Sequence, residues 1–246
     1  MNHFFVSLLG AFVLVTGSVA SARTPPPDFT GVWERYPQAY ADDDEDPPPP
    51  GGQPELKEPY ASARNDFLER RRAAVARGKP LIDDSTRCRP EGMPTIMGAT
   101  YAIEILQSPK DVVVLAEFLT QTRRIFLDEK MAPLEEITPS YNGYSVGHWE
   151  GSTLVVETRG VLEDVQFAPF GIPHSRQMKI TERLRLSGPN LLVNHVVVED
   201  PEVLVKPYVF DFGYRKNPKY KIVEYICDNN RSEAAEDGSV RLKVTP

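Results

Sequence analysis

Beyond Pro94 the hydrophobic residues recur mainly at every second position, in short runs rich in Val, Ile, Tyr and Phe. This period is typical of β-strands that bury one face. The turn-forming stretches SPKD, EGS, SGPN and KNP separate the runs. The pattern predicts strands at Tyr101–Gln107, Asp111–Phe118, Thr122–Asp128, Tyr144–Trp149, Thr153–Thr158, Gln177–Leu186, Leu191–Glu199, Val203–Tyr214 and Lys219–Cys227, after a first strand that opens near Gly31.

One segment follows a different period. Apolar side chains between residues 56 and 77 recur at helical spacing, and Gly78 with Pro80 ends that pattern, which predicts a helix lying against the sheet. Strands joined by short turns pair antiparallel, and closing a sheet removes its exposed edges. We therefore expect an all-β, mainly antiparallel domain with one N-terminal helix, a lipocalin-like β-barrel of roughly eight to ten strands, with a β-sandwich as the alternative.

The first 22 residues resemble a leader rather than part of the fold. The apolar run FFVSLLGAFVLV is followed by small residues and by Ala20–Ala22, which match an A-x-A cleavage site. The run is too short to span a membrane, which takes roughly 20 apolar residues. We expect cleavage near Ala22, a periplasmic or secreted protein without a membrane span, and a single domain over residues 23–246.

The composition of the chain limits the classes of molecule that it could bind. The formal net charge is −7, whereas nucleic-acid binders usually carry a basic patch, so nucleic acid is excluded as a partner. Residues 37–54 combine an acidic run with prolines and glycines, and we expect a mobile loop there. Residues 231–246 are expected to form a flexible tail.

The chain has two cysteines, Cys88 and Cys227. In an oxidising compartment such a pair tends to join, and closing a loop of this size is worth roughly 4 to 5 kcal/mol in the chain-entropy model. Two buried free thiols are the alternative. Two cysteines alone do not make a structural zinc site, and we expect neither a metal nor another cofactor.

Seven segments stand out in chain order: CRPEGMPTIM (Cys88–Met97), YAIEILQSPKDVVVL (Tyr101–Leu115), RRIFLDEKMAP (Arg123–Pro133), NGYSVGHWEGSTLVVET (Asn142–Thr158), GIPHSRQMKITERLRL (Gly171–Leu186), VVEDPEVLVKPY (Val197–Tyr208) and EYICDNN (Glu224–Asn230). Together they resemble a large family of exported bacterial proteins, and this resemblance brings no established activity. The opening Gly31-x-Trp33 is also similar to the start of lipocalin-like barrels.

Two predicted strands place a carboxylate on an apolar face. Glu182 shares its face with Ile180 and Leu184, and Glu224 alternates in the same way on the last predicted strand. A buried carboxylate must be paired or hydrogen-bonded. Arg123 and Arg124 face opposite sides of another strand, so one of them should point inward. The pairing is interpreted either as a structural lock or as the polar floor of a pocket.

His174 lies at the entrance of the Glu182 strand. Eight residues of straight strand separate the two side chains by roughly 27 Å, so they cannot form a hydrogen-bonded pair. As a general acid or base, His174 would need a carboxylate from elsewhere, with Asp128, Glu150 and Asp164 as candidates; alternatively it caps a turn with Ser175. The GYSVG motif around Ser145 fits G-x-S-x-G but lacks the strand–turn–helix context of a nucleophile elbow.

The sequence thus favours a barrel that takes a small, partly apolar organic molecule into its interior, with cofactor-free acid–base chemistry as its specific form. A non-catalytic carrier and an envelope interaction protein are the alternatives. Catalysis is assigned to His174, Glu182 and Glu224. Ligand binding is assigned to Arg123, Arg124, Asp128, Tyr141, Asn142, Trp149, Asn194 and Tyr208.

Overall fold

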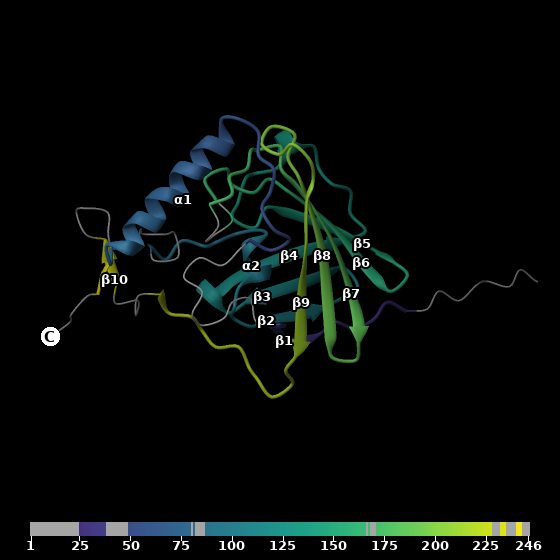
Figure 1. Cartoon of the computed structure of the whole chain (residues 1–246). Coiled ribbons are helices and arrows are strands. Elements are labelled where there is room, and N and C mark those ends of the chain that lie inside the picture. The colour runs from purple at the N-terminus through teal and green to yellow at the C-terminus, as the bar shows by residue number, and fades with distance from the viewer. Residues whose placement is uncertain are drawn as a thin grey trace, which may run out of the picture.

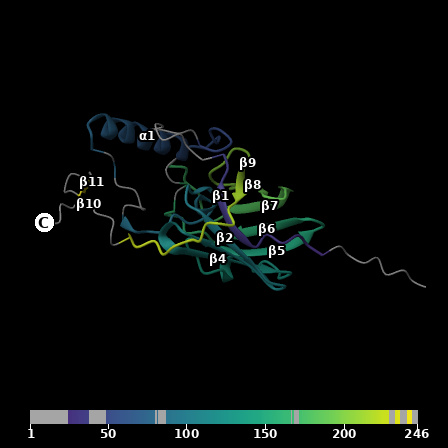
Figure 2. The ribbon, with the colours of Figure 1, turned by 90° about the horizontal axis from the view of Figure 1, so that it is seen from below.

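In the computed structural model, nine strands close into a barrel in which each strand pairs with the next and β9 pairs with β1 (Figures 1 and 2). The structure describes residues 25–37, 49–79, 81, 87–165, 167, 171–227, 232–234 and 240–242. The strands are β1 (Gly31–Arg35), β2 (Ile103–Gln107), β3 (Asp111–Ala116), β4 (Gln121–Leu127), β5 (Tyr144–Glu150), β6 (Thr153–Arg159), β7 (Lys179–Gly188), β8 (Leu191–Glu199) and β9 (Tyr208–Lys216). The expectation of a mainly antiparallel barrel of this size is confirmed.

One pair departs from the antiparallel pattern. β4 and β5 run parallel and pair at only three positions, Ile125–Ser145, Phe126–Val146 and Leu127–Gly147. The connection from Asp128 to Gly143 is too long for a hairpin turn, and parallel neighbours need such a crossing connection. The barrel wall is therefore held by a short ladder at this position, as short as those of β1 with β2 and with β9.

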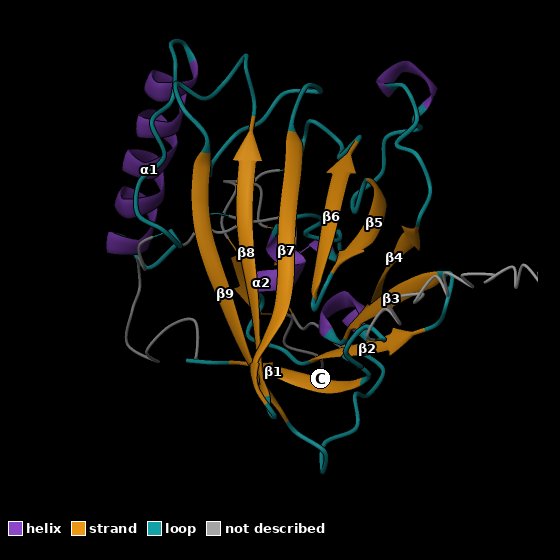
Figure 3. Cartoon of the chain, turned by 90° about the vertical axis from the view of Figure 1, so that its right-hand side faces the viewer, coloured by secondary structure: helices purple, strands orange, loops and turns teal. Residues whose placement is uncertain are grey.

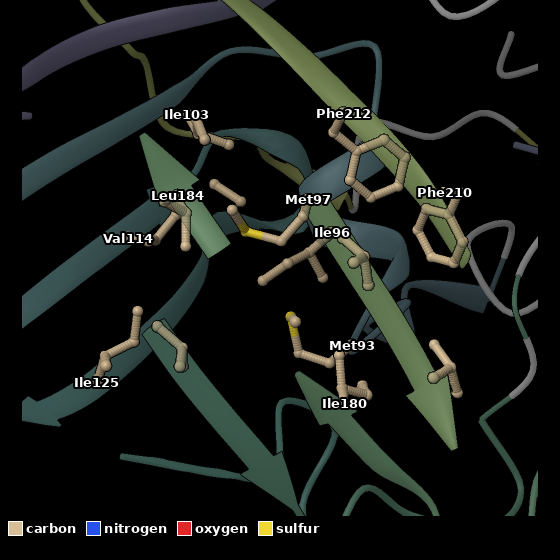
Figure 4. Packing of buried hydrophobic residues seen from close by; sticks show 14 of the residues in the cluster. Met93, Ile96, Met97, Ile103, Val114, Ile125, Ile180, Leu184, Phe210 and Phe212 are labelled. Atoms are coloured by element: carbon tan, nitrogen blue, oxygen red, sulfur yellow. The ribbon is translucent and has the colours of Figure 1, made fainter. Parts of the chain in front are cut away.

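A short helix fills the barrel interior. Helix α2 (Thr95–Gly98) lies behind β7 and β8 in Figure 3, and Met93, Ile96 and Met97 pack among the inward side chains of the surrounding strands (Figure 4). All three are almost fully buried. Tyr214 of β9 donates a hydrogen bond to the Met97 carbonyl oxygen (2.6 Å). The pattern analysis did not predict α2, because four residues are too few to establish a helical period.

Helix α1 (Tyr60–Ala76) lies outside the barrel (Figures 1 and 3). It begins later than the predicted residue 56, because Pro59 stands at the N-cap and Leu56 instead forms a bridge with Leu204. Its Phe67 ring packs on Gly171, where an added Cβ would lie 2.4 Å from ring atoms. The helix itself is confirmed, whereas its expected position against the sheet stays a prediction, because Gly171 belongs to a loop.

One predicted strand begins too early, and another predicted strand is absent from the described residues. β9 begins at Tyr208 rather than Val203, because Asp200 accepts hydrogen bonds from the backbone N–H groups of Glu202 and Val203 and holds a turn there. Residues 219–227 form no strand. β9 already closes the barrel on β1, so no barrel edge remains for this β-prone segment to join.

Cys88 and Cys227 form a disulfide that spans 139 residues of sequence. It ties the segment before α2 to the end of the irregular 219–227 segment, not to a last strand as expected. Within the predicted tail, Ser232–Ala234 (β10) and Val240–Leu242 (β11) pair antiparallel. The expected leader and residues 38–48 of the acidic loop lie outside the described residues. No helix of the described ranges is long and apolar enough to cross a membrane.

Candidate functional site

Five consecutive strands, β4 to β8, each contribute one polar side chain to a buried hydrogen-bonded set in the barrel interior, and we call this set the polar belt. Its members are Arg123, Ser145, Thr158, Glu182 and Asn194, one from each strand in that order. Strand alternation explains the arrangement, since each residue occupies an inward position of its strand; Glu182 lies between Ile180 and Leu184, and Asn194 between Leu192 and Val196. The prediction that Glu182 meets an arginine inside the barrel is therefore correct.

Arg123 is the centre of the polar belt. Its Nη1 donates to Glu182 Oε1 (3.1 Å), and its Nη2 donates to Glu182 Oε2 and to Thr158 Oγ1 (2.9 Å). Its Nε donates to Ser145 Oγ (3.2 Å). The Ser145 and Thr158 hydroxyls share a 2.8 Å hydrogen bond, and Asn194 Nδ2 donates to Glu182 Oε1 (2.7 Å). The guanidinium and carboxylate thus meet through two parallel hydrogen bonds, the strongest geometry for this pair.

The polar belt is sealed from solvent. Glu182 is 0% exposed, so no water-sized sphere touches it, and the Arg123 side chain is 1% exposed. A ligand in the lumen would have to displace α2 or strand side chains to reach the carboxylate. The contacts of Glu182 are those of a lock between strands, which was one of the two interpretations of the sequence.

The nearby phenol of Tyr214 is fully buried, and this burial raises its pKa far above the ordinary value, while the Glu182 carboxylate adds to the shift. Arg35 and Arg123 act in the opposite direction through their positive charges. Tyr214 is therefore a neutral hydrogen-bond donor at all ordinary pH values, in keeping with its bond to α2.

His174 lies apart from the polar belt, in the loop that precedes β7. Its Nδ1 is 3.0 Å from the Ser175 carbonyl oxygen, which only accepts, so Nδ1 carries the proton. Its Nε2 is buried and has no hydrogen-bond partner among the described residues. Asp200 accepts from the backbone N–H (2.6 Å) and hydroxyl (2.8 Å) of Ser175. His174 and Ser175 thus belong to a turn anchored by Asp200.

None of the three carboxylates expected to orient His174 does so within the described ranges. Glu150 pairs with Arg183, and Asp164 pairs with Arg89. Asp128 is exposed and carries a positive φ of 59° in the turn after β4. His174 also shares no hydrogen bond with Glu182 there, as the reach argument predicted.

Glu224 is misplaced by the sequence analysis. It lies exposed on the irregular 219–227 segment, so the prediction that it points inward is wrong. Two expected ligand residues have other contacts: Trp149 packs on Phe29 with ring centres 5.2 Å apart, and the buried Tyr208 donates to the Pro50 carbonyl oxygen. Neither residue lines the cleft between β4 and β5.

A cleft of about 400 Å³ opens where the β4–β5 ladder stops. On the N-terminal side of the Ile125–Ser145 pair the two strands are no longer paired. There Asn142 Nδ2 donates a hydrogen bond to the Thr122 carbonyl oxygen (3.2 Å) in place of a ladder bond. Gly143 turns the chain into β5 with a φ of 64°, and a Cβ there would lie 2.6 Å from the Arg159 carbonyl oxygen. Glycine is required at this turn.

The cleft brings together four of the eight residues assigned to ligand binding, Arg123, Arg124, Tyr141 and Asn142. The Phe126 and Tyr144 rings stack in its wall with centres 5.4 Å apart, and the Arg124 guanidinium lies 5.0 Å from the Phe126 ring centre. Arg124 itself is exposed and paired with Asp111. Arg123 and Ser145 form the inner end of the cleft, so the opening leads towards the polar belt.

Sequence reasoning missed the cleft because the hydrophobic pattern does not reveal strand order. The length of the 128–143 connection was the available signal, since an interval too long for a hairpin indicates a crossing and a weakly paired neighbour.

The chain matches no protein-family model and no curated protein. Among solved structures it is similar to two single-residue variants of the fluorescent protein UnaG. One is 18% identical with a TM-score of 0.28, over 47% of this chain and 70% of that chain. The other is 19% identical with a TM-score of 0.27, over 48% and 71%. At these TM-scores the likeness supports no conclusion about ligand or chemistry.

Proposed function

We propose that this protein is an exported binding protein that takes a small, flat, partly apolar organic molecule into the β4–β5 cleft. One observation supports this most directly: the barrel wall opens into a cleft of about 400 Å³ that combines stacked aromatic rings with polar side chains. Small-molecule sites are typically apolar hollows of about 300 to 1,000 Å³ with a few convergent polar groups.

The cleft suits a planar ligand better than a flexible chain. Phe126 and Tyr144 are already stacked, with their ring planes 28° apart, and a further ring adds to such a stack through dispersion and quadrupole attraction. Tyr141 and Asn142 add polar atoms to the lining. The ligand is therefore expected to carry an aromatic or conjugated body with at least one hydrogen-bonding group.

Acid–base catalysis in the lumen, the more specific expectation from the sequence, has less support. Glu182 is 0% exposed and its carboxylate is occupied by Arg123 and Asn194. His174 belongs to a separate loop, and Glu224 lies on the outside. Binding without turnover is the simpler function of this arrangement.

The proposal is tested by fluorescence titration with N-phenyl-1-naphthylamine, an uncharged flat aromatic probe. The wild-type protein should bind it saturably, and Phe126→Leu should weaken binding about two- to tenfold, the range expected for one aromatic contact. Thr122→Trp, which adds a bulky ring at an exposed position of the cleft wall, should weaken binding further.

Tyr36→Leu is the matched control, because Tyr36 is also a partly exposed ring beside an arginine, Arg215, but does not line the cleft. Its affinity should equal that of the wild type. Absence of saturable binding by the wild type, or equal affinities in all variants, would overturn the proposal.

Export is the second part of the proposal. It is supported by the leader-like first 22 residues and by the Cys88–Cys227 disulfide, since such bonds persist mainly in oxidising compartments. Protein recovered from the periplasm should begin near Arg23 and should have a mass two hydrogens lower than the reduced chain. A retained Met1 in that fraction contradicts cleavage.

A further inference from the structure

A second hollow lies at the ends of β6, β7 and β8, and its volume of about 510 Å³ exceeds that of the β4–β5 cleft. We call it the basic hollow. Arg159 ends β6, Lys179 begins β7, Glu199 ends β8, and Lys57 with the loop from Asp200 to Pro207 closes the outer side. It shares no lining residue with the cleft, so it is a separate candidate site.

The lining is rich in cations although the chain has a net charge of −7. Four cationic side chains, Lys57, Arg159, Lys179 and Lys206, line the basic hollow together with two carboxylates. Lys179 pairs with Glu199, Lys206 pairs with Glu55, and Arg159 pairs with Glu157 through its Nε. Lys57 and the Nη groups of Arg159 are therefore the cationic donors that remain to decide what the hollow binds.

Both of these cations have donors to spare. Lys57 Nζ donates to the Pro201 carbonyl oxygen (2.7 Å) and forms no ion pair with any described carboxylate. Arg159 uses only its Nε, which donates to Glu157 Oε1 (2.7 Å). Its Nη1 and Nη2 make no hydrogen bond with the described residues, and the side chain is 32% exposed. Two parallel Nη–H donors are the geometry that matches a carboxylate.

The carboxylates of the lining do not cancel this preference. Asp200 is 3% exposed, and its oxygens accept hydrogen bonds from Ser175 in the loop before β7 and from Glu202 and Val203 in its own loop. Its charge is thus compensated by backbone and hydroxyl donors. Glu199 is held by Lys179.

One wall of the basic hollow is apolar. Leu204, Val205 and two prolines line it, and the Val205 side chain is 57% exposed. An exposed valine in the same hollow as a partly desolvated arginine provides a surface for the apolar body of a ligand whose charged head meets Lys57 and Arg159. Inorganic anions would leave this wall uncovered.

We infer that the basic hollow binds a small organic carboxylate, with the carboxylate on Arg159 and Lys57 and the apolar body on Val205 and Leu204. The inference is independent of the proposed cleft ligand, because the two sites share no residue. A carboxylate contact of this kind depends on charge and is weakened by salt.

The test is a ¹H–¹⁵N NMR titration of the oxidised, full-length mature protein with benzoate and with benzamide, its uncharged counterpart. Benzoate should shift the amide signals around Arg159, Gln177 and residues 199–207 saturably, and added salt should weaken the effect. Benzamide should produce no saturable shift there. Arg159→Gln should weaken benzoate binding about tenfold or more, since it removes a charge-assisted hydrogen bond.

Lys57→Gln is a second variant of the hollow that does not touch a strand, and Arg185→Gln is the matched control on β7, an exposed arginine outside the lining. The control should bind benzoate as the wild type does. The inference is overturned if benzamide shifts the same signals with equal affinity, if both hollow variants bind benzoate normally, or if benzoate shifts only the signals of the β4–β5 cleft.

Discussion

The Arg123–Glu182 pair joins β4 to β7 across the barrel, and removing one partner tests whether the polar belt stabilises the fold. Arg123→Met leaves the 0% exposed Glu182 carboxylate without its cation, and Glu182→Leu leaves the buried guanidinium without its anion. Breaking a buried pair in this way costs about 3 to 5 kcal/mol. For a domain of this size that loss lowers Tm by about 6 to 20 °C.

The double variant Arg123→Met/Glu182→Leu should recover much of this loss. Ser145 and Thr158 keep their mutual 2.8 Å hydrogen bond, so the main group left without a partner is the Asn194 amide, whose cost is about 1 to 3 kcal/mol. The stability loss of the double variant should therefore be several kcal/mol smaller than the sum of the losses of the two single variants. A difference of this sign shows that the two side chains interact directly.

The assay is urea unfolding at neutral pH with the disulfide intact, followed by tryptophan fluorescence and far-UV circular dichroism. Arg183→Met is the control, because Arg183 and Glu150 form an Arg–Glu pair at the surface, with 2.8 Å between Nη2 and Oε2. A surface pair of this kind is worth about 1 kcal/mol or less. Single variants within the range of this control, or a double variant whose loss equals the sum of the singles, would refute the role given to the pair.

Three further outcomes are expected. Burial raises the pKa of the Tyr214 phenol, so with rising pH the unfolded chain loses this proton before the folded chain does. The stability that this group contributes is complete below about pH 10 and falls by about 1.4 kcal/mol per pH unit above it. The difference in stability between wild type and Tyr214→Phe should therefore narrow between about pH 10 and pH 11.5. Replacing Cys88 and Cys227 by alanine should cost about 2 to 5 kcal/mol, measured by urea unfolding; an unchanged midpoint contradicts the loop-closure argument. Gly92→Ala should cost about 2 kcal/mol more stability than Gly78→Ala. Both glycines have a φ near 66°, but a Cβ at Gly92 would lie 2.3 Å from a backbone oxygen, whereas the space at Gly78 is open. Equal losses would mean that the backbone strain of a positive φ alone decides the cost.

Much of the barrel is determined by the sequence itself. Alternation of apolar and polar residues depends only on which face of each strand is buried, so β2 to β8 lie within a few residues of their predicted positions. The same alternation placed Glu182 inside, and the cost of an unpaired buried charge required an arginine near it. The cysteine pair also followed from composition and the expected compartment.

The tertiary structure decided everything that depends on neighbours in space. Residues 219–227 have the pattern of a strand but not its hydrogen bonds, because β9 and β1 close the barrel first, and Glu224 is exposed as a result. The four-residue helix α2 fills the lumen, which no periodicity can show in so short a segment. Strand order made β4 and β5 a short parallel pair, and the cleft exists only because that ladder ends early. The local hydrophobic pattern indicates whether each residue is buried. A binding site depends on which residues, distant in sequence, line the same cleft, and only the closed barrel determines this.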